Sequence, residues 1–199
     1  MSYGIEWAPG ATTVGARFEN FVILGSEKRV NFGGRVLSKA GKKVFKISDN
    51  IAAACAGLVS DFQVLTSTVK AYVQLFKLEH ERSISIKSLA KLMSGILYSR
   101  RIFPYFTDTI IGGIDEEGPQ VIVLDLIGSA IDDDYAAIGT GSQVAIGILE
   151  EEYNLNLKID AAKELIKKSI QSAIERDPSS GNGMDLVIIE KDKIQEFSL

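Results

Sequence analysis

The spacing of hydrophobic residues changes several times along the chain and divides it into strand-like and helix-like blocks. Residues 21–25 and 51–56 form almost wholly apolar runs, which are typical of strands covered on both faces. From residue 58 the apolar positions recur every three or four residues instead, which predicts an amphipathic helix. A second helix is expected over 86–101, before Pro104.

The remaining blocks complete an order of strands, two helices, strands, two helices and strands. Strands are expected at 12–16, 21–27, 35–38, 43–47, 51–57, 108–114, 120–125 and 184–190, with a short one at the C-terminus. Two further helices are expected near 142–152 and 161–176, and Asp160 is a candidate N-cap for the latter. Because strands and helices are segregated rather than alternating, the pattern predicts one α+β domain with two sheets between two helical layers.

The composition excludes several classes of partner. The chain has 199 residues, of which 46% are hydrophobic and 24% charged, which is enough for one packed core. A net charge of −4 and scattered lysines and arginines do not favour binding to nucleic acid. No apolar stretch is long enough to cross a membrane, and residues 1–10 lack the basic and apolar regions of a secretory signal. We therefore expect a cytoplasmic protein whose partners are proteins or peptides.

Cysteine and histidine occur once each, which restricts the chemistry. One cysteine excludes a disulfide within the chain, and one cysteine with one histidine is too few for a Cys/His zinc site. No Ser-His-Asp triad is expected around His80, which falls in a charged stretch. Cys55 is expected to be a small buried hydrophobe, and His80 a solvated residue at a helix end. The carboxylate runs at 132–134 and 150–152 are interpreted as solvated surface, because consecutive side chains point in different directions.

Six segments, taken in order, carry a specific resemblance. They are GATTVG at 10–15, EKRV at 27–30, SKAGKK at 38–43, AGLVSDFQ at 56–63, YAAIGTGS at 135–142 and ERDPSSGNGMD at 175–185. Together they cover nearly the whole chain and resemble the β-type subunits of the proteasome core particle, of the archaeal kind. The resemblance implies a four-layer αββα sandwich of the N-terminal nucleophile hydrolase type.

In that family a threonine hydroxyl attacks the peptide bond, with the chain's own α-amine as base once a pro-segment has been removed. A lysine ammonium lowers the pKa of the amine and the hydroxyl, and a carboxylate holds the lysine in place. By position, Lys43 matches the lysine and Glu27 its partner, where many relatives have aspartate. Gly57 matches the residue whose backbone N–H forms the oxyanion hole.

The resemblance also implies supporting residues and a pocket. Asp177 and Ser180 match the supporting pair beside the N-terminus, and Thr140 replaces the usual serine while keeping a hydroxyl. An apolar pocket of moderate width, for the residue before the cut, is lined by Val30, Cys55 and Val59. No metal and no organic cofactor are implied.

Ala11 stands at the nucleophile position when Val14-Gly15 is aligned with the family's Val-Gly. Alanine has no hydroxyl, so neither peptide cleavage nor removal of the pro-segment can proceed through it. Thr12 is a poor substitute for the missing nucleophile. To bring Thr12 to position 11 the strand would have to shift by one residue, which would turn every side chain to the opposite face. We therefore expect residues 1–10 to remain attached as a leader, with the unprocessed junction at Gly10 and Ala11, and residues 11–199 to form the β-type domain.

Two functions remain open. In the first, the chain is a non-catalytic structural subunit of a threonine endopeptidase that degrades unfolded proteins. In the second, it is a catalytic threonine protease subunit inactivated by a Thr-to-Ala substitution at position 11, and the intact set of Glu27, Lys43, Asp177 and Ser180 favours this one. The implied partners are other β-subunits in a seven-membered ring, an α-ring, an unfolding ATPase and protein substrates.

Two related classes of subunit fit less well. The bacterial threonine protease with β-type rings alone ranks lower, because segments 56–63 and 176–183 are closer to the archaeal and eukaryotic proteasome. An α-type subunit is disfavoured because the chain has little room for a helix before the first strand.

Overall fold

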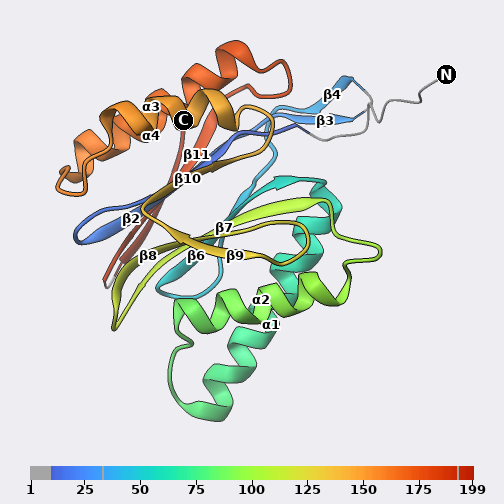
Figure 1. The fold of residues 1–199 in the computed structure, drawn as a ribbon, viewed down its shortest axis with the longest axis vertical. Coiled ribbons are helices and arrows are strands. Elements are labelled where there is room, and N and C mark those ends of the chain that lie inside the picture. The colour runs from blue at the N-terminus through green and yellow to red at the C-terminus, as the bar shows by residue number, and fades with distance from the viewer. Residues whose placement is uncertain (1–9, 33, 192) are drawn as a thin grey trace.

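The structure is a computed structural model, and it describes residues 10–32, 34–191 and 193–199. In chain order the elements are β1 (Thr13–Arg17), β2 (Phe21–Glu27), β3 (Val30–Phe32), β4 (Arg35–Ser38), β5 (Val44–Lys46), β6 (Ile51–Gly57), α1 (Val59–His80), α2 (Ile86–Ser99), β7 (Thr107–Asp115), β8 (Gly118–Leu124), β9 (Ala130–Asp133), β10 (Tyr135–Ile138), α3 (Ser142–Glu152), α4 (Ile159–Arg176), β11 (Met184–Glu190) and β12 (Lys193–Ser198). Figure 1 shows α3 and α4 above two stacked sheets, and α1 and α2 below them.

The first sheet has the strand order β10-β1-β2-β11-β12, and all neighbouring strands are antiparallel. Helices α3 and α4 cover its outer face, where their buried side chains join those of the sheet in one apolar cluster. The central strand β2 is buried along its whole length, because one face meets these helices and the other meets the second sheet.

The second sheet has the order β5-β6-β7-β8-β9, again with antiparallel neighbours. Its outer face packs against α1 and α2, whose apolar stripes supply residues such as Leu65, Val69 and Leu89. A separate two-stranded hairpin, β3-β4, projects beside these layers (Figure 1).

Small residues allow the two sheets to pack closely. Ala52, Ala54 and Ala56 of β6 contribute to the apolar cluster between the sheets. A Cβ atom on Gly112 of β7 would come within 3 Å of the Val22 and Leu24 side chains, so the absence of a side chain there permits the close approach.

The expected αββα sandwich is confirmed, and most element bounds agree within two residues. Three short strands, β3, β9 and β10, were not expected. The prediction that Asp160 caps α4 is wrong: the N-cap is Lys158, and Asp160 lies in the first turn, where its charge complements the helix dipole. Cys55 is fully buried and His80 is exposed at the end of α1, as expected.

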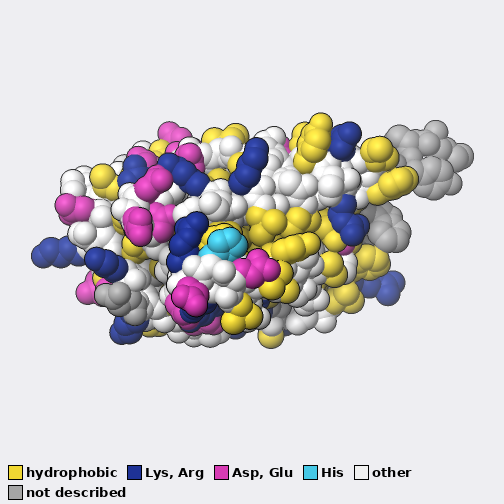
Figure 2. Space-filling model, turned by 90° about the horizontal axis from the view of Figure 1, so that it is seen from below, with side chains coloured by type: hydrophobic (Ala, Val, Ile, Leu, Met, Phe, Trp, Pro, Cys, Tyr) yellow, Lys and Arg dark blue, Asp and Glu magenta, His cyan; other side chains and the backbone are white. Residues whose placement is uncertain are grey.

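The outer side of the α1-α2 layer exposes a group of large apolar side chains. The exposed residues on α1, on α2 and in the loop after α2 are Val64, Tyr72, Leu75, Leu78, Tyr98, Ile102, Phe103 and Phe106. Figure 2 views this side of the molecule, with apolar side chains gathered near the single histidine, His80. Within the described residues, no helix is both long and apolar enough to cross a membrane.

Candidate active site

The first strand sends alternate side chains into two different layers, and this decides which residue faces the predicted catalytic groups. Ala11 is fully buried in the cluster between the sheets, together with Val44, which directly follows Lys43. Thr13, two residues on and on the same face, donates its hydroxyl to the Cys55 carbonyl at 3.0 Å. The Cys55 N–H in turn donates to the Lys43 carbonyl at 2.9 Å. Ala11 therefore lies on the Lys43 side of the strand.

Thr12 points the other way. Its Oγ1 lies 2.8 Å from Ser180 Oγ, and a side chain on Gly141 would overlap it. Its hydroxyl is thus held on the face opposite Ala11, which agrees with the expectation that Thr12 does not replace the missing nucleophile.

The structure brings Glu27 and Lys43 together as a buried ion pair. Glu27 ends β2 and Lys43 directly precedes β5, so two different sheets supply the two charges. Lys43 Nζ donates to Glu27 Oε1 and also to the Arg29 carbonyl oxygen at 2.6 Å. Glu27 Oε2 accepts the Arg29 N–H at 2.6 Å and the Gly181 N–H at 3.0 Å. Every polar atom of the carboxylate therefore has a partner.

The environment of Lys43 disfavours its charged form. Burial lowers the pKa of Lys43 below its ordinary value, and the neighbouring Glu27 carboxylate raises it only in part. A lysine with a lowered pKa loses its proton more readily than an exposed one, which suits a group that shares protons with its neighbours.

A second polar group lies on the opposite face of β1. Asp177 Oδ2 accepts hydrogen bonds from Thr140 Oγ1 at 2.5 Å and from Ser180 Oγ at 2.7 Å. Ser180 is fully buried and also contacts the Thr12 hydroxyl, so a chain of hydrogen bonds runs from Thr140 through Asp177 and Ser180 to Thr12. The predicted supporting residues are therefore brought together.

The backbone around residue 11 is held tightly. The Ala11 carbonyl oxygen accepts the Gly141 N–H at 3.3 Å and lies 3.4 Å from Thr140 Oγ1. Gly10 is packed so closely against Ser179 and Thr140 that a side chain on it would overlap both. The predicted junction of Gly10 and Ala11 is therefore packed between the segments that carry Thr140-Gly141 and Ser179. Residues 1–9 of the leader expected over 1–10 lie outside the described residues.

Gly57 and the predicted pocket residues come from different elements. Gly57 ends β6 with a φ of +135°, and a Cβ atom there would overlap the Phe106 carbonyl oxygen. Cys55 lies beside Thr109 on the neighbouring strand β7, with 3.7 Å between Sγ and Oγ1, and its burial raises the pKa of the thiol to about 12. Val30 begins β3 against Gly41, and Val59 begins α1; both are partly exposed. The oxyanion and pocket roles remain predictions.

Sequence reasoning missed the groups that hold the charged pair in place. Arg29 contributes its backbone N–H and carbonyl, while its side chain donates to the Pro178 carbonyl at 2.7 Å and to Asn182 Oδ1 at 3.0 Å. It thereby ties the Lys43 site to the loop after α4. Arg29 belongs to the EKRV segment, so the sequence flagged its place, but backbone donors such as the Gly181 N–H leave no side-chain signature.

The chain is similar to known proteins over almost its whole length. The family described as "Proteasome subunit" matches residues 8–189. "Proteasome subunit beta 2" of Pyrobaculum aerophilum is 45% identical over 193 residues, covering 97% of this chain and 95% of the relative. "Proteasome subunit beta 1" of Hyperthermus butylicus is 42% identical over 194 residues, covering 97% and 94%. "Proteasome subunit beta 2" of Thermofilum pendens is 45% identical over 187 residues, covering 94% and 91%.

Proposed function

Since this chain belongs to the proteasome subunit family, as a β-type subunit similar to archaeal ones, we propose that it serves as a non-catalytic structural subunit. A β-type subunit assembles with other proteasome subunits. The proposed particle is a cytoplasmic threonine endopeptidase in which this chain occupies a seven-membered β-ring. An α-ring gates entry to that particle, and an unfolding ATPase delivers protein substrates to it.

The observation that carries this proposal is the alanine at position 11. Ala11 lies on the side of β1 that faces Lys43, where a nucleophile would have to stand, and its side chain offers no hydroxyl. The nearest hydroxyl along the strand, that of Thr12, is bonded to Ser180 on the other face. The nucleophile and its supporting residues act as a unit, so little catalysis remains when the nucleophile is missing.

A second candidate function has its own supporting observation. Glu27 and Lys43 are fully paired, and Asp177 and Ser180 are hydrogen-bonded to each other, although an idle site does not need either arrangement. This favours a catalytic threonine protease subunit in which alanine replaces the threonine at position 11.

The substitution Ala11→Thr separates the two candidates. The variant would be assembled with its partner subunits, and the mass of this chain and the peptidase rate of the particle would be measured. For a structural subunit we expect the mass of the full, uncleaved variant chain and no added activity. Glu27 is one methylene longer than the aspartate of many relatives, and the Gly10-Ala11 junction is held by Thr140, Ser179 and Gly141.

Cleavage after Gly10 together with new peptidase activity would overturn the structural proposal in favour of the second candidate. The double variant Ala11→Thr/Lys43→Ala is the control. If cleavage persists in the double variant, a neighbouring active subunit has cut the junction, and this chain's own site has not.

A further inference from the structure

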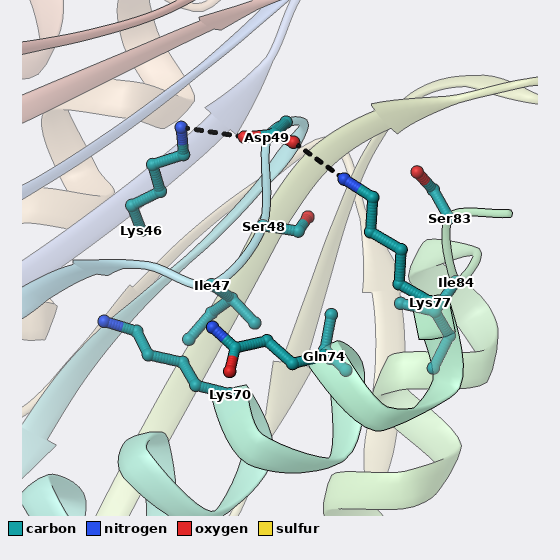
Figure 3. Close-up of a pocket in the computed structure, with 10 residues that line it drawn as sticks. Lys46, Ile47, Ser48, Asp49, Lys70, Gln74, Lys77, Ser83 and Ile84 are labelled. Atoms are coloured by element: carbon teal, nitrogen blue, oxygen red, sulfur yellow. Dashed lines mark hydrogen bonds and ion pairs between the residues drawn. The ribbon is translucent and has the colours of Figure 1, made fainter. Parts of the chain in front are cut away.

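A cavity of about 420 Å³ lies where the β5-β6 turn meets the second half of α1. Its lining combines three lysines, one aspartate, polar side chains and three aliphatic residues. They are Lys46, Ile47, Ser48, Asp49, Lys70, Val73, Gln74, Lys77, Ser83 and Ile84. Figure 3 shows Lys46 and Lys77 reaching Asp49 from opposite sides, with Gln74 between the lysines of α1.

The cavity is separate from the candidate active site. It lies at the Ile51 end of β6, whereas Gly57, at the other end, adjoins the active-site region. Seven residues of extended strand place the two ends about 20 Å apart. Any ligand of this cavity is therefore distinct from a peptide near Ala11, and the inference does not depend on the proposed function.

The charges of the cavity are unbalanced. Three lysines and one aspartate give three positive charges against one negative at neutral pH. Asp49 already engages two of the lysines, with Oδ1 at 3.2 Å from Lys46 Nζ and Oδ2 at 3.2 Å from Lys77 Nζ. The third, Lys70, has no ion pair within the part of the chain that the structure describes and rests over the Phe45 ring at 5.9 Å.

Asp49 itself shows what these ammonium groups bind. Its carboxylate is shared between two lysines, one oxygen to each, on a side chain that is 79% exposed. Because the aspartate is so exposed, an incoming carboxylate can replace it without disturbing the core. Asp49 thus competes with an external acidic group for Lys46 and Lys77.

The floor of the cavity adds a second requirement. Ile47, Val73 and Ile84 line the cavity beneath the charged rim, and the 5–7% of each residue that is exposed adds apolar surface there. A small inorganic anion would use the lysines and leave this floor uncovered. The volume lies in the range of sites that accept several side-chain-sized groups.

We propose that this cavity binds an acidic peptide segment of a partner protein, in which a carboxylate side chain stands next to an aliphatic or aromatic one. The carboxylate meets Lys70 and takes over part of the role of Asp49 at Lys46 and Lys77. The neighbouring apolar side chain covers Ile47, Val73 and Ile84.

The proposal is tested by fluorescence anisotropy of the full chain with a labelled peptide that alternates leucine and glutamate. Three comparison probes are the same peptide with glutamine for glutamate, the same peptide with serine for leucine, and inorganic phosphate as competitor. The glutamate peptide should bind about tenfold more tightly than its glutamine counterpart at low salt, and the difference should shrink as salt is raised.

Variants of the protein give changes in opposite directions. Lys70→Gln should weaken binding of the glutamate peptide about threefold. Asp49→Asn should tighten it about threefold, because two lysines lose their internal partner. A misfolded variant would not bind more tightly, so this increase cannot come from loss of folding. The matched control is Lys163→Gln on α4, because Lys163 is another partly buried lysine over a phenylalanine ring, 3.9 Å from Phe197.

Five results would overturn the proposal. The first four are equal binding of the glutamate and glutamine peptides, no tightening by Asp49→Asn, equal weakening by Lys70→Gln and Lys163→Gln, and unchanged affinity after serine replaces leucine. Competition by phosphate at the concentration where the peptide binds would likewise overturn it, and would identify a site for free anions.

Discussion

Lys43 keeps its ammonium group almost completely out of water, and the atoms around it explain how the fold tolerates a charge there. Its side chain is 2% exposed and that of Glu27 is 0% exposed. The Arg29 carbonyl oxygen and the Glu27 carboxylate supply the acceptors that solvent would otherwise provide. Removing one member of such a pair leaves the other charged and unpaired in the interior, which costs more than the pair contributes.

Glu27→Ala should therefore lower the free energy of unfolding by about 3–5 kcal/mol. The double variant Glu27→Gln/Lys43→Met should be less destabilised than Glu27→Ala, because neither charge is then stranded. Urea unfolding followed by circular dichroism measures both values. As a matched control, Glu117→Gln removes the partner of Lys87 in an exposed ion pair and should leave stability unchanged. Equal effects of Glu27→Ala and Glu117→Gln would contradict this account.

The sequence predicted the charged side chains of the site but not the way they are held. Glu27 and Lys43 were identified by position within the EKRV and SKAGKK segments. Their contacts with the Arg29 and Gly181 backbone depend on how the loop after α4 folds over β2, and backbone atoms are the same in every residue. The direction of the Thr12 hydroxyl, in contrast, is what strand alternation gives, since neighbouring side chains point to opposite faces.

Among the elements, long and strongly periodic segments were predicted well and short polar ones were not. β2 and β6 carry apolar runs, and α1 has a clear helical period, so their bounds agree closely. β9 reads AIDD and is exposed along its length, because it is an edge strand whose pairing to β8 depends on tertiary contact. No local pattern distinguishes such a strand from a loop.

The end of β6 offers a prediction at this scale. Gly57→Ala should destabilise the protein by about 2–3 kcal/mol or more, because a Cβ atom there would overlap the Phe106 carbonyl oxygen at a backbone φ of +135°. Thermal unfolding measures the shift.

The control for Gly57→Ala is Gly147→Ala in the middle of α3, where nothing lies within 4 Å of the added atom. That change should stabilise the protein by about 0.5–1 kcal/mol, because alanine loses less conformational freedom in a helix than glycine does. If both substitutions shifted stability in the same direction, the strain assigned to Gly57 would be contradicted.

For the whole molecule, the two helical layers differ in what they show to solvent. Most of the large exposed apolar side chains on helices lie on α1 and α2, including Leu78 at 80% exposure, and the loop that follows α2 adds Phe103 at 86% (Figure 2). Apolar groups of this size on one face are typical of surfaces that contact another protein. A subunit that assembles with others of its family has such contacts to make.

The double variant Leu75→Glu/Leu78→Glu should therefore reduce assembly while leaving the isolated chain folded. Each leucine contributes about 1.5–3 kcal/mol when fully buried, so the assembled fraction should fall at least about tenfold at limiting concentration. Analytical ultracentrifugation of the mixed subunits measures it, with Glu79→Gln on the same helix as the polar control. Normal assembly of the double variant would show that this face stays in solvent.

The packing of Gly10 and Ala11 against Thr140, Ser179 and Gly141 also has a kinetic meaning. If the junction stays uncut, an external peptide must compete with Gly10 and Ala11, which belong to the same chain and cannot diffuse away. Tethering over so short a distance corresponds to an effective concentration of about millimolar or higher. As long as the junction is uncut, the packed segment of Gly10 and Ala11 acts as an internal inhibitor, and a hydroxyl restored at position 11 cannot serve a substrate until the junction is cut.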